Sequence, residues 1–135
     1  MLTSIAGKSA IVTGGSKGIG KGIAKVFGAQ GAKIMIAARG EEAAKAAVAE
    51  IEAAGGTAAY HLCDVSDWED VQGLVAATKA AFGSVDILCA NAGIFPQKKM
   101  IDMAPEDWDQ VLSTNLKSTF LCVKACIPEF EAAGK

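Results

Sequence analysis

The sequence has no hydrophobic run of the length that a membrane-spanning helix needs, which is about 18 to 20 residues. It also lacks an excess of basic residues, because 13 Lys and Arg stand against 15 Asp and Glu, for a net charge of −2. A nucleic-acid-binding domain normally carries a basic surface, so that class of function is not expected. The first residues, MLTSIAGKSAIV, contain no long apolar segment. We therefore expect no signal peptide and a cytoplasmic location.

Cysteine and histidine are too few and too scattered for a disulfide or metal framework. The cysteines are Cys63, Cys89, Cys122 and Cys126. They form neither a C-x-x-C redox motif nor a paired metal-ligand pattern. Cys122 and Cys126 lie four residues apart on an expected helix and could share a ligand face, but small buried thiols are the simpler interpretation. The only histidine, His61, falls in an expected strand and is assigned a structural role. We expect no metal site.

Four short apolar segments alternate with helical patterns along the chain. The segments are SAIV (9–12), IMIA (34–37), AAYHL (58–62) and VDILCA (85–90). Their shortness and nearly continuous apolar character are typical of parallel strands buried on both faces. The alternation predicts an α/β fold, a doubly wound parallel sheet with right-handed crossovers and helices on both faces. No linker or repeat interrupts residues 1–135, so we interpret them as one domain.

The expected helices are marked by residues that favour helix ends. An alanine-rich pattern over residues 41–54 is followed by two glycines, which end helices well. SDWE (66–69) has the form of a capping box with Ser66 at the N-cap. Pro105 suits the first position of a long helix toward the C-terminus. Pro128 is expected to kink or break that helix near its end.

The first apolar segment runs directly into a glycine-rich turn, TGGSKGIG (13–20). Gly14, Gly18 and Gly20 follow the spacing G-x-x-x-G-x-G. Glycine can adopt positive φ and lets a phosphate approach the backbone, and the N–H groups of the following helix then bind a pyrophosphate. The alternative is a tight strand-to-helix turn that binds no ligand.

Further motifs follow the later strands, and together with the glycine turn they resemble the short-chain dehydrogenase/reductase family. The matching residues of the turn are Thr13, Gly14, Gly18, Ile19 and Gly20. CDV (63–65) resembles the family's adenine-contacting Asp-Val pair, and NAG (91–93) resembles its Asn-Ala-Gly turn. STNL (113–116) is similar to the segment that carries the catalytic-site asparagine. The resemblance covers essentially the whole chain, although CDV and NAG could instead serve only their turns.

The resemblance implies a Rossmann-like fold and a bound nicotinamide dinucleotide. The cofactor-binding positions that it implies are Gly14, Ser16, Lys17, Gly18, Ile19, Gly20, Arg39, Asp64, Val65, Asn91, Ala92 and Gly93. It also implies that Asn115 holds a helix distortion and an ordered water in a catalytic proton relay. The neighbours Leu112, Leu116 and Thr119 predict that Asn115 is partly buried.

The end of the second apolar segment indicates which nicotinamide cofactor binds. An acidic residue there would bind the ribose hydroxyls and repel a 2′-phosphate, but this sequence has Ala38 followed by Arg39. Arginine offers a planar fork of donors for phosphate, and Lys17 adds a second cation. In the family, basic residues at these two positions accompany a preference for NADP, which we predict as the cofactor. The alternative is that both are solvated surface charges.

The resemblance further implies hydride transfer between NADP(H) and a small carbonyl or alcohol substrate, such as a 3-oxoacyl thioester. The family's catalytic serine, and its tyrosine with a lysine four residues later, have no match here. The only tyrosine is Tyr60, and Asp64 stands four residues after it. We expect residues 1–135 to be the N-terminal portion of a complete reductase that lacks its C-terminal strands and helices. Alone, this portion should be poorly soluble and inactive.

Two other functions stay open. One is a non-catalytic module that binds a nucleotide or another subunit. The other is a different Rossmann-like class, such as a methyltransferase, whose adenosine cofactor has no pyrophosphate. The basic pair of Lys17 and Arg39 disfavours the methyltransferase.

The expected C-terminal helix carries an apolar stripe. Its members are Leu112, Leu116, Phe120, Val123 and Ile127. In the family this helix packs against its copy in a neighbouring subunit, which predicts a homotetramer, with a dimer as the second choice. The alternative is that the stripe faces only its own sheet.

Overall fold

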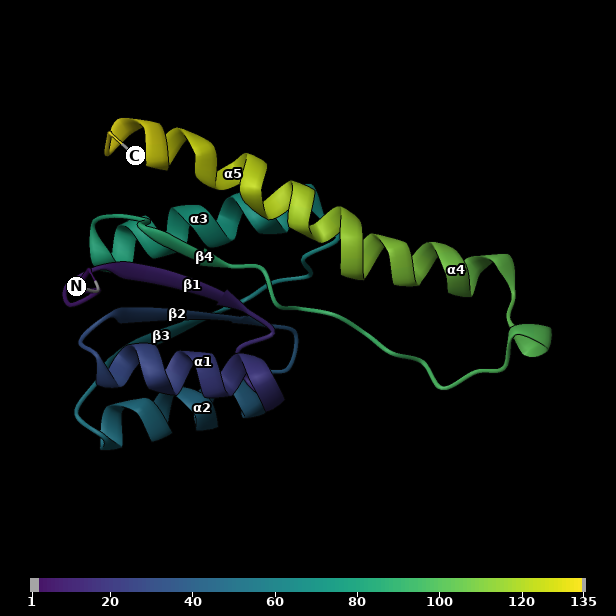
Figure 1. The fold of residues 1–135 in the computed structure, drawn as a ribbon, viewed down its shortest axis with the longest axis horizontal. Helices are drawn as coiled ribbons and strands as arrows, with labels where there is room; N and C mark the ends of the chain where they lie inside the picture. The colour runs from purple at the N-terminus through teal and green to yellow at the C-terminus, as the bar shows by residue number, and fades with distance from the viewer. Residues whose placement is uncertain (1–2, 135) are drawn as a thin grey trace.

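The computed structural model describes residues 3–134, which form a parallel four-stranded sheet in the order β3-β2-β1-β4 (Figure 1). The strands are β1 (Ser9–Thr13), β2 (Lys33–Ala38), β3 (Thr57–Leu62) and β4 (Ile87–Cys89). β1 lies between β2 and β4, with Ile11 opposite Met35 on one side and Leu88 on the other. The predicted α/β fold class is confirmed. Residues 1, 2 and 135 of the predicted domain lie outside the described residues.

Helices cover both faces of the sheet (Figure 1). They are α1 (Gly18–Ala29) and α2 (Glu41–Ala53) on one face, and α3 (Trp68–Phe82) and α5 (Ser118–Ala132) on the other. All five residues of β1 are buried, and its three apolar residues, at positions 10–12, alternate between the two cores. Val12 packs in the cluster with α1 and α2, whereas Ile11 packs in the cluster with α3 and α5. A strand buried on both faces explains why the sequence is apolar without alternation.

The start of α3 differs from its predicted form. The N-cap is Asp67, whose carboxylate accepts a hydrogen bond from the Asp70 N–H at 2.9 Å. Ser66 donates its hydroxyl to the carboxylate of Asp64 at 2.6 Å. The predicted capping box at Ser66 is therefore wrong, because the hydroxyl that would cap the helix is bound to a charged acceptor just before it.

The chain after β4 forms an extended segment, a short 3-10 turn η1 (Met100–Asp102), and then a helical rod that includes α5 (Figure 1). The rod consists of α4 (Pro105–Leu112), a π-helical turn η2 (Ser113–Lys117) and α5. Pro105 is the first helical residue, as predicted. In Figure 1, α4 extends well beyond the sheet while α5 lies over α3.

Pro128 does not break this rod. α5 continues past it to Ala132, so a break at this position is wrong, while the other predicted effect, a kink, stays a prediction. Proline removes one N–H bond from a helix, but Leu121, Cys122 and Cys126 pack into the core on the same helix, and this packing favours the helical form on both sides of Pro128.

The two cysteines of α5 are core residues, as predicted for structural thiols. Cys122 is 2% exposed and Cys126 is 1% exposed. Burial raises the pKa of the Cys126 thiol to about 12, so it stays protonated and unreactive at neutral pH.

Among residues 3–134, no helix combines the length and the apolar character needed to cross a membrane.

Candidate functional site

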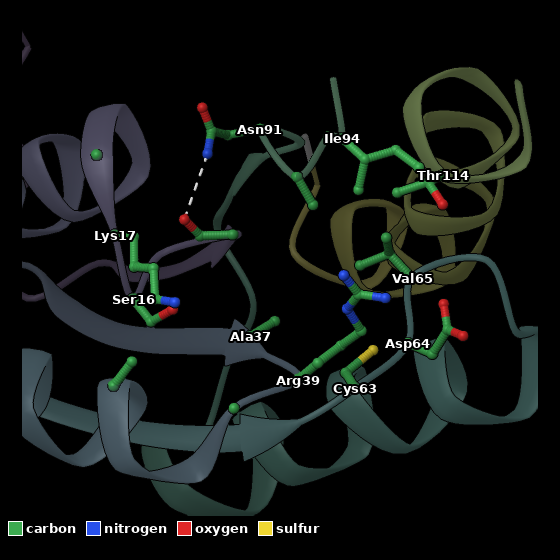
Figure 2. Close-up of a pocket in the computed structure, with 16 residues that line it drawn as sticks. Ser16, Lys17, Ala37, Arg39, Cys63, Asp64, Val65, Asn91, Ile94 and Thr114 are labelled. Carbon is green, nitrogen blue, oxygen red and sulfur yellow. Dashed lines mark hydrogen bonds between the residues drawn. The ribbon is translucent and has the colours of Figure 1, made fainter. Parts of the chain in front are cut away.

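A pocket of about 380 Å³ lies at the carboxyl ends of the strands (Figure 2). Most of its lining comes from the end of a strand or the chain just after it: Gly14, Ser16, Lys17 and Gly18 after β1, Ala37, Arg39 and Gly40 at and after β2, Cys63, Asp64 and Val65 after β3, and Asn91, Ala92, Gly93 and Ile94 after β4. Ala43 from α2 and Thr114 from η2 complete the lining. In doubly wound sheets, ligands bind in the crevice at this edge.

The glycine turn forms the pocket wall between β1 and α1. Gly14 and Gly18 have φ values of +64° and +53°, in the left-handed region that favours glycine. The N-cap of α1 is Lys17, whose side chain makes no capping hydrogen bond. The first N–H groups of α1 are thus left without a side-chain cap, and the positive end of the helix dipole lies beside them. Such a helix start is suited to binding a phosphate group.

The turn after β4 is bonded directly to the end of β1. The Thr13 hydroxyl oxygen accepts hydrogen bonds from Asn91 N–H at 2.9 Å and Ala92 N–H at 3.0 Å. The Asn91 side-chain amide donates to the Thr13 carbonyl at 3.1 Å and to the Gly14 carbonyl at 3.5 Å, the dashed line in Figure 2. A Cβ on Gly20 would overlap the Gly14 carbonyl and the Asn91 amide. These contacts fix the glycine turn against the turn at 91–93.

Two cations of the pocket have no carboxylate partner. Among residues 3–134, neither Lys17 nor Arg39 takes part in an ion pair, whereas five other lysines do. Figure 2 shows Arg39 extending from the end of β2 toward Asp64 and Val65, with Lys17 on the side of the glycine turn. Ala38, which replaces the acid of NAD-binding sites, is 7% exposed.

Asp64 is the carboxylate of the pocket. One oxygen, Oδ1, accepts hydrogen bonds from the Ser66 N–H at 2.9 Å and from the Ser66 hydroxyl at 2.6 Å. These two bonds, with a smaller contribution from the charge of Arg39, hold the pKa of Asp64 below its ordinary value. Asp64 is therefore an anion at neutral pH and can only accept hydrogen bonds.

Asn115 lies in the π-helical turn and binds the backbone of the segment after β4. Its Oδ1 accepts from Ile94 N–H at 2.7 Å, and its Nδ2 donates to the Ile94 carbonyl at 2.8 Å. The Ser118 N–H reaches back five residues to the Ser113 carbonyl, as in a π-helix. The helix distortion that the resemblance implied at Asn115 is thus present.

The predicted partial burial of Asn115 is wrong. Asn115 is exposed, and so are its neighbours Leu112, Leu116 and Thr119. The physical reason is the position of α4 and η2, which project past the sheet edge instead of packing on it (Figure 1).

The pocket gathers ten of the predicted site residues: Gly14, Ser16, Lys17, Gly18, Arg39, Asp64, Val65, Asn91, Ala92 and Gly93. Three others lie outside its lining. Ile19 is 79% exposed on α1, Gly20 packs beneath the turn, and Asn115 lines an adjoining cavity that includes Ile94.

Six lining residues were not predicted: Ala37, Gly40, Ala43, Cys63, Ile94 and Thr114. Four of them directly adjoin a predicted residue in the sequence, so adjacency to a motif was the available signal. Ala37 is the last but one residue of β2 and directly precedes the Ala38–Arg39 pair. Ala43 lies in the first turn of α2 and had no such signal.

Tyr60 does not belong to the pocket. It lies on β3 and donates its hydroxyl to Glu41 Oε1 at 2.8 Å. That hydrogen bond raises the pKa of Tyr60. A tyrosine that donates and accepts protons near neutral pH needs a lowered pKa, so Tyr60 has the wrong place and the wrong environment.

Replacing Gly20 with alanine should destabilise the protein by about 1–3 kcal/mol, because the new Cβ would overlap the Gly14 carbonyl and force the turn to move. The matched control is Gly22→Ala, two residues further along α1, where a Cβ meets nothing within 4 Å. That change should be neutral or stabilise by up to about 1 kcal/mol through helix propensity. Urea unfolding of both variants measures the difference, and equal midpoints would contradict the steric role of Gly20.

Comparison with known proteins agrees with this geometry. The family model described as short chain dehydrogenase matches residues 8–135. A 2,5-dichloro-2,5-cyclohexadiene-1,4-diol dehydrogenase, LinX, of Sphingobium indicum is 40% identical over 134 residues, which are 99% of this chain and 54% of the relative. The 3-oxoacyl-[acyl-carrier-protein] reductase FabG of Staphylococcus aureus is 37% identical over 90% of this chain and 50% of its own length. The chain spans about half the length of the curated relatives it matches.

Solved structures give the same result. A metagenomic short-chain oxidoreductase in complex with NADP aligns with a TM-score of 0.88 at 38% identity, over 97% of this chain and 60% of its own. A short-chain dehydrogenase/reductase from Mycobacterium marinum aligns with a TM-score of 0.92 at 34% identity, over 97% of this chain and 53% of its own. The chain therefore belongs to the short-chain dehydrogenase/reductase family.

Proposed function

We propose that the pocket binds NADP and that the whole protein transfers hydride between NADP(H) and a carbonyl or alcohol substrate. One observation carries the choice of cofactor. Lys17 and Arg39 line the pocket without ion-pair partners among residues 3–134, and Ala38 stands where an acid would repel a 2′-phosphate. Unpaired cations at a pocket are suited to bind a phosphate.

The donors and acceptors of the pocket fit the parts of this dinucleotide. The N–H groups of the turn at 14–20 would bind the pyrophosphate, Lys17 and Arg39 the 2′-phosphate, Asp64 and Val65 the adenine, and residues 91–93 the ribose. When bound, the nicotinamide supplies the site that gives or takes the hydride. The chain's own part is to bind, orient and shield the dinucleotide.

Asn115 is the catalytic-site residue that we assign to this chain. Its amide is fixed on the Ile94 backbone, and the π-helical turn sets it beside the pocket. Its proposed role is to hold this distortion and to order a water in the proton relay. The FabG relative makes 3-oxoacyl thioesters the first substrates to test. Four free cysteines fit a cytoplasmic location.

A second candidate function is subunit interaction, which the outer face of the helical rod favours. The stripe of Leu112, Leu116, Phe120, Val123 and Ile127 is exposed, and Leu116 and Phe120 reach 66% and 60% exposure. Exposed apolar stripes on helices are typical of protein–protein contacts. We propose that this stripe forms a helix contact in a homotetramer.

Arg39→Asp should weaken NADPH binding by on the order of 2–4 kcal/mol and NADH binding much less, because it removes a phosphate contact and adds an anion. Fluorescence titration with both dinucleotides measures the two affinities.

Lys8→Asp is the matched control for net charge. Lys8 directly precedes β1, so it lies at the amino-terminal end of this strand, whereas the pocket lies at the carboxyl end. It should leave both affinities unchanged. Equal losses for NADPH and NADH in the Arg39 variant would overturn the assignment of Arg39 to the 2′-phosphate.

The 135-residue chain should not oxidise NADPH in the presence of an acetoacetyl thioester or simple ketones. Its only tyrosine is bound to Glu41 outside the pocket, and no tyrosine–lysine pair is present to pass the proton. Absorbance of NADPH measures turnover, and Tyr60→Phe is the control that should leave dinucleotide binding intact. Turnover by this chain would refute the proton relay proposed above.

Val123→Asp should dissociate the proposed tetramer, because a charge in an apolar helix contact loses its hydration. The matched control is Ala132→Asp, an exposed position at the end of α5 outside the stripe. Sedimentation velocity at micromolar concentration measures the assembly. A monomeric wild-type protein would count against the proposal.

A further inference from the structure

The turn that carries Asp64 and Val65 is fixed from two sides. On the side-chain side, Ser66 occupies Asp64 Oδ1 with its N–H and its hydroxyl. On the backbone side, the Asp64 N–H donates to Asp70 Oδ2 at 2.8 Å. The Asp70 carboxylate therefore reaches back six residues, from the first turn of α3 to the end of β3.

Capping of α3 does not account for this contact. The cap is Asp67, which accepts from the Asp70 N–H. The Asp70 side chain takes no part in that bond and points its acceptor to the turn instead. Asp70 also places a negative charge near the Asp64 anion, which is unfavourable in itself. If Asp70 serves to hold the 64–65 turn in place, the position of its carboxylate next to the Asp64 N–H is explained.

The fixed turn presents an acceptor and a donor next to one another. Because Ser66 engages Oδ1, the second oxygen of Asp64 remains for a ligand. In residues 3–134, the Val65 N–H makes no backbone or side-chain hydrogen bond, and Val65 lines the pocket. Adenine offers the matching pair on one edge, an amino donor at C6 beside the N1 acceptor, whereas hypoxanthine reverses both.

We propose that Asp70 is a positioning residue that, together with Ser66, fixes the Asp64–Val65 turn so that the pocket selects a 6-aminopurine over a 6-oxopurine. This inference rests on the proposed binding of a dinucleotide. It assigns base selection to two residues, Asp70 and Ser66, that adjoin the pocket without lining it. Both act through Asp64 and Val65.

The test compares NADPH with its deamino analogue, reduced nicotinamide hypoxanthine dinucleotide phosphate, by fluorescence or calorimetric titration. Wild-type protein should prefer NADPH by about tenfold or more, since a mismatched donor–acceptor pair loses hydrogen bonds to a charged group. Asp70→Ala should weaken NADPH about tenfold and the analogue by less than about twofold, so that the preference collapses. Ser66→Ala should shift the ratio in the same direction.

Two matched variants separate positioning from stability and charge. Asp70→Asn keeps an oxygen that can accept from the Asp64 N–H and should retain most of the preference. Glu69→Ala removes another acid of the first turn of α3 and should change neither affinity, because within residues 3–134 the Glu69 side chain forms no hydrogen bond or ion pair with the 64–65 turn. Thermal unfolding of each variant reports whether the fold is kept.

Each outcome decides the matter. Equal weakening of both dinucleotides by Asp70→Ala, or an unchanged ratio in that variant, would overturn the inference and assign Asp70 a structural role only. Equal affinity of the wild type for both dinucleotides would overturn the inference and leave the proposed function standing. Failure of the wild type to bind either dinucleotide would overturn the proposed function and this inference with it.

Discussion

The joint between the ends of β1 and β4 is the contact on which the rest of the site depends. Thr13, only 2% exposed, accepts two N–H groups from the turn at 91–92, and Asn91 returns two bonds to the carbonyls of Thr13 and Gly14. β4 pairs with β1 over only three residues, so this small network supplies much of what fixes its end. It also places the glycine turn and the 91–93 turn at one pocket. Its buried polar groups are satisfied by one another, which makes the geometry specific.

Charged side chains at the pocket differ in their pairing from many of those on the rest of the surface. Away from the pocket, five lysines form ion pairs; for example, Lys21 and Lys25 share Glu50, and Lys45 binds Glu41. At the pocket the cations stay unpaired among residues 3–134 while the one carboxylate, Asp64, is held by neutral Ser66. Arg39 lies near enough to Asp64 for its charge to lower the pKa of that carboxyl, whereas Lys17 lies on the side of the glycine turn. The pocket thus offers both cations and an anion to a ligand, and the proposed dinucleotide carries groups that suit each of them.

The sequence pattern was sufficient for the parallel sheet and the glycine turn, which have local signatures, and the family resemblance supplied ten of the residues that line the pocket. The sequence did not predict the structure correctly where two neighbouring residues suit the same role. Ser66 and Asp67 both suit an N-cap, and the choice depends on Asp64, which takes the Ser66 hydroxyl. The burial of Asn115 and the continuity of α5 through Pro128 both depend on what packs against the helical rod. The spacing of apolar residues along a helix does not indicate how far that helix extends past its sheet.

The side of the site at Thr13 and the side at Asn115 are held in place by different sets of contacts. The dinucleotide side rests on the buried joint at Thr13 and on loops that follow consecutive strands of one sheet. The Asn115 side rests on two hydrogen bonds to Ile94, at the root of an arm that projects from the body (Figure 1). Ile94 lines the pocket and also the adjoining cavity beside Asn115. A displacement of the Ile94 backbone would therefore break these two hydrogen bonds or move the Asn115 amide with it, which couples the residue proposed for the proton relay to the segment that lines the pocket.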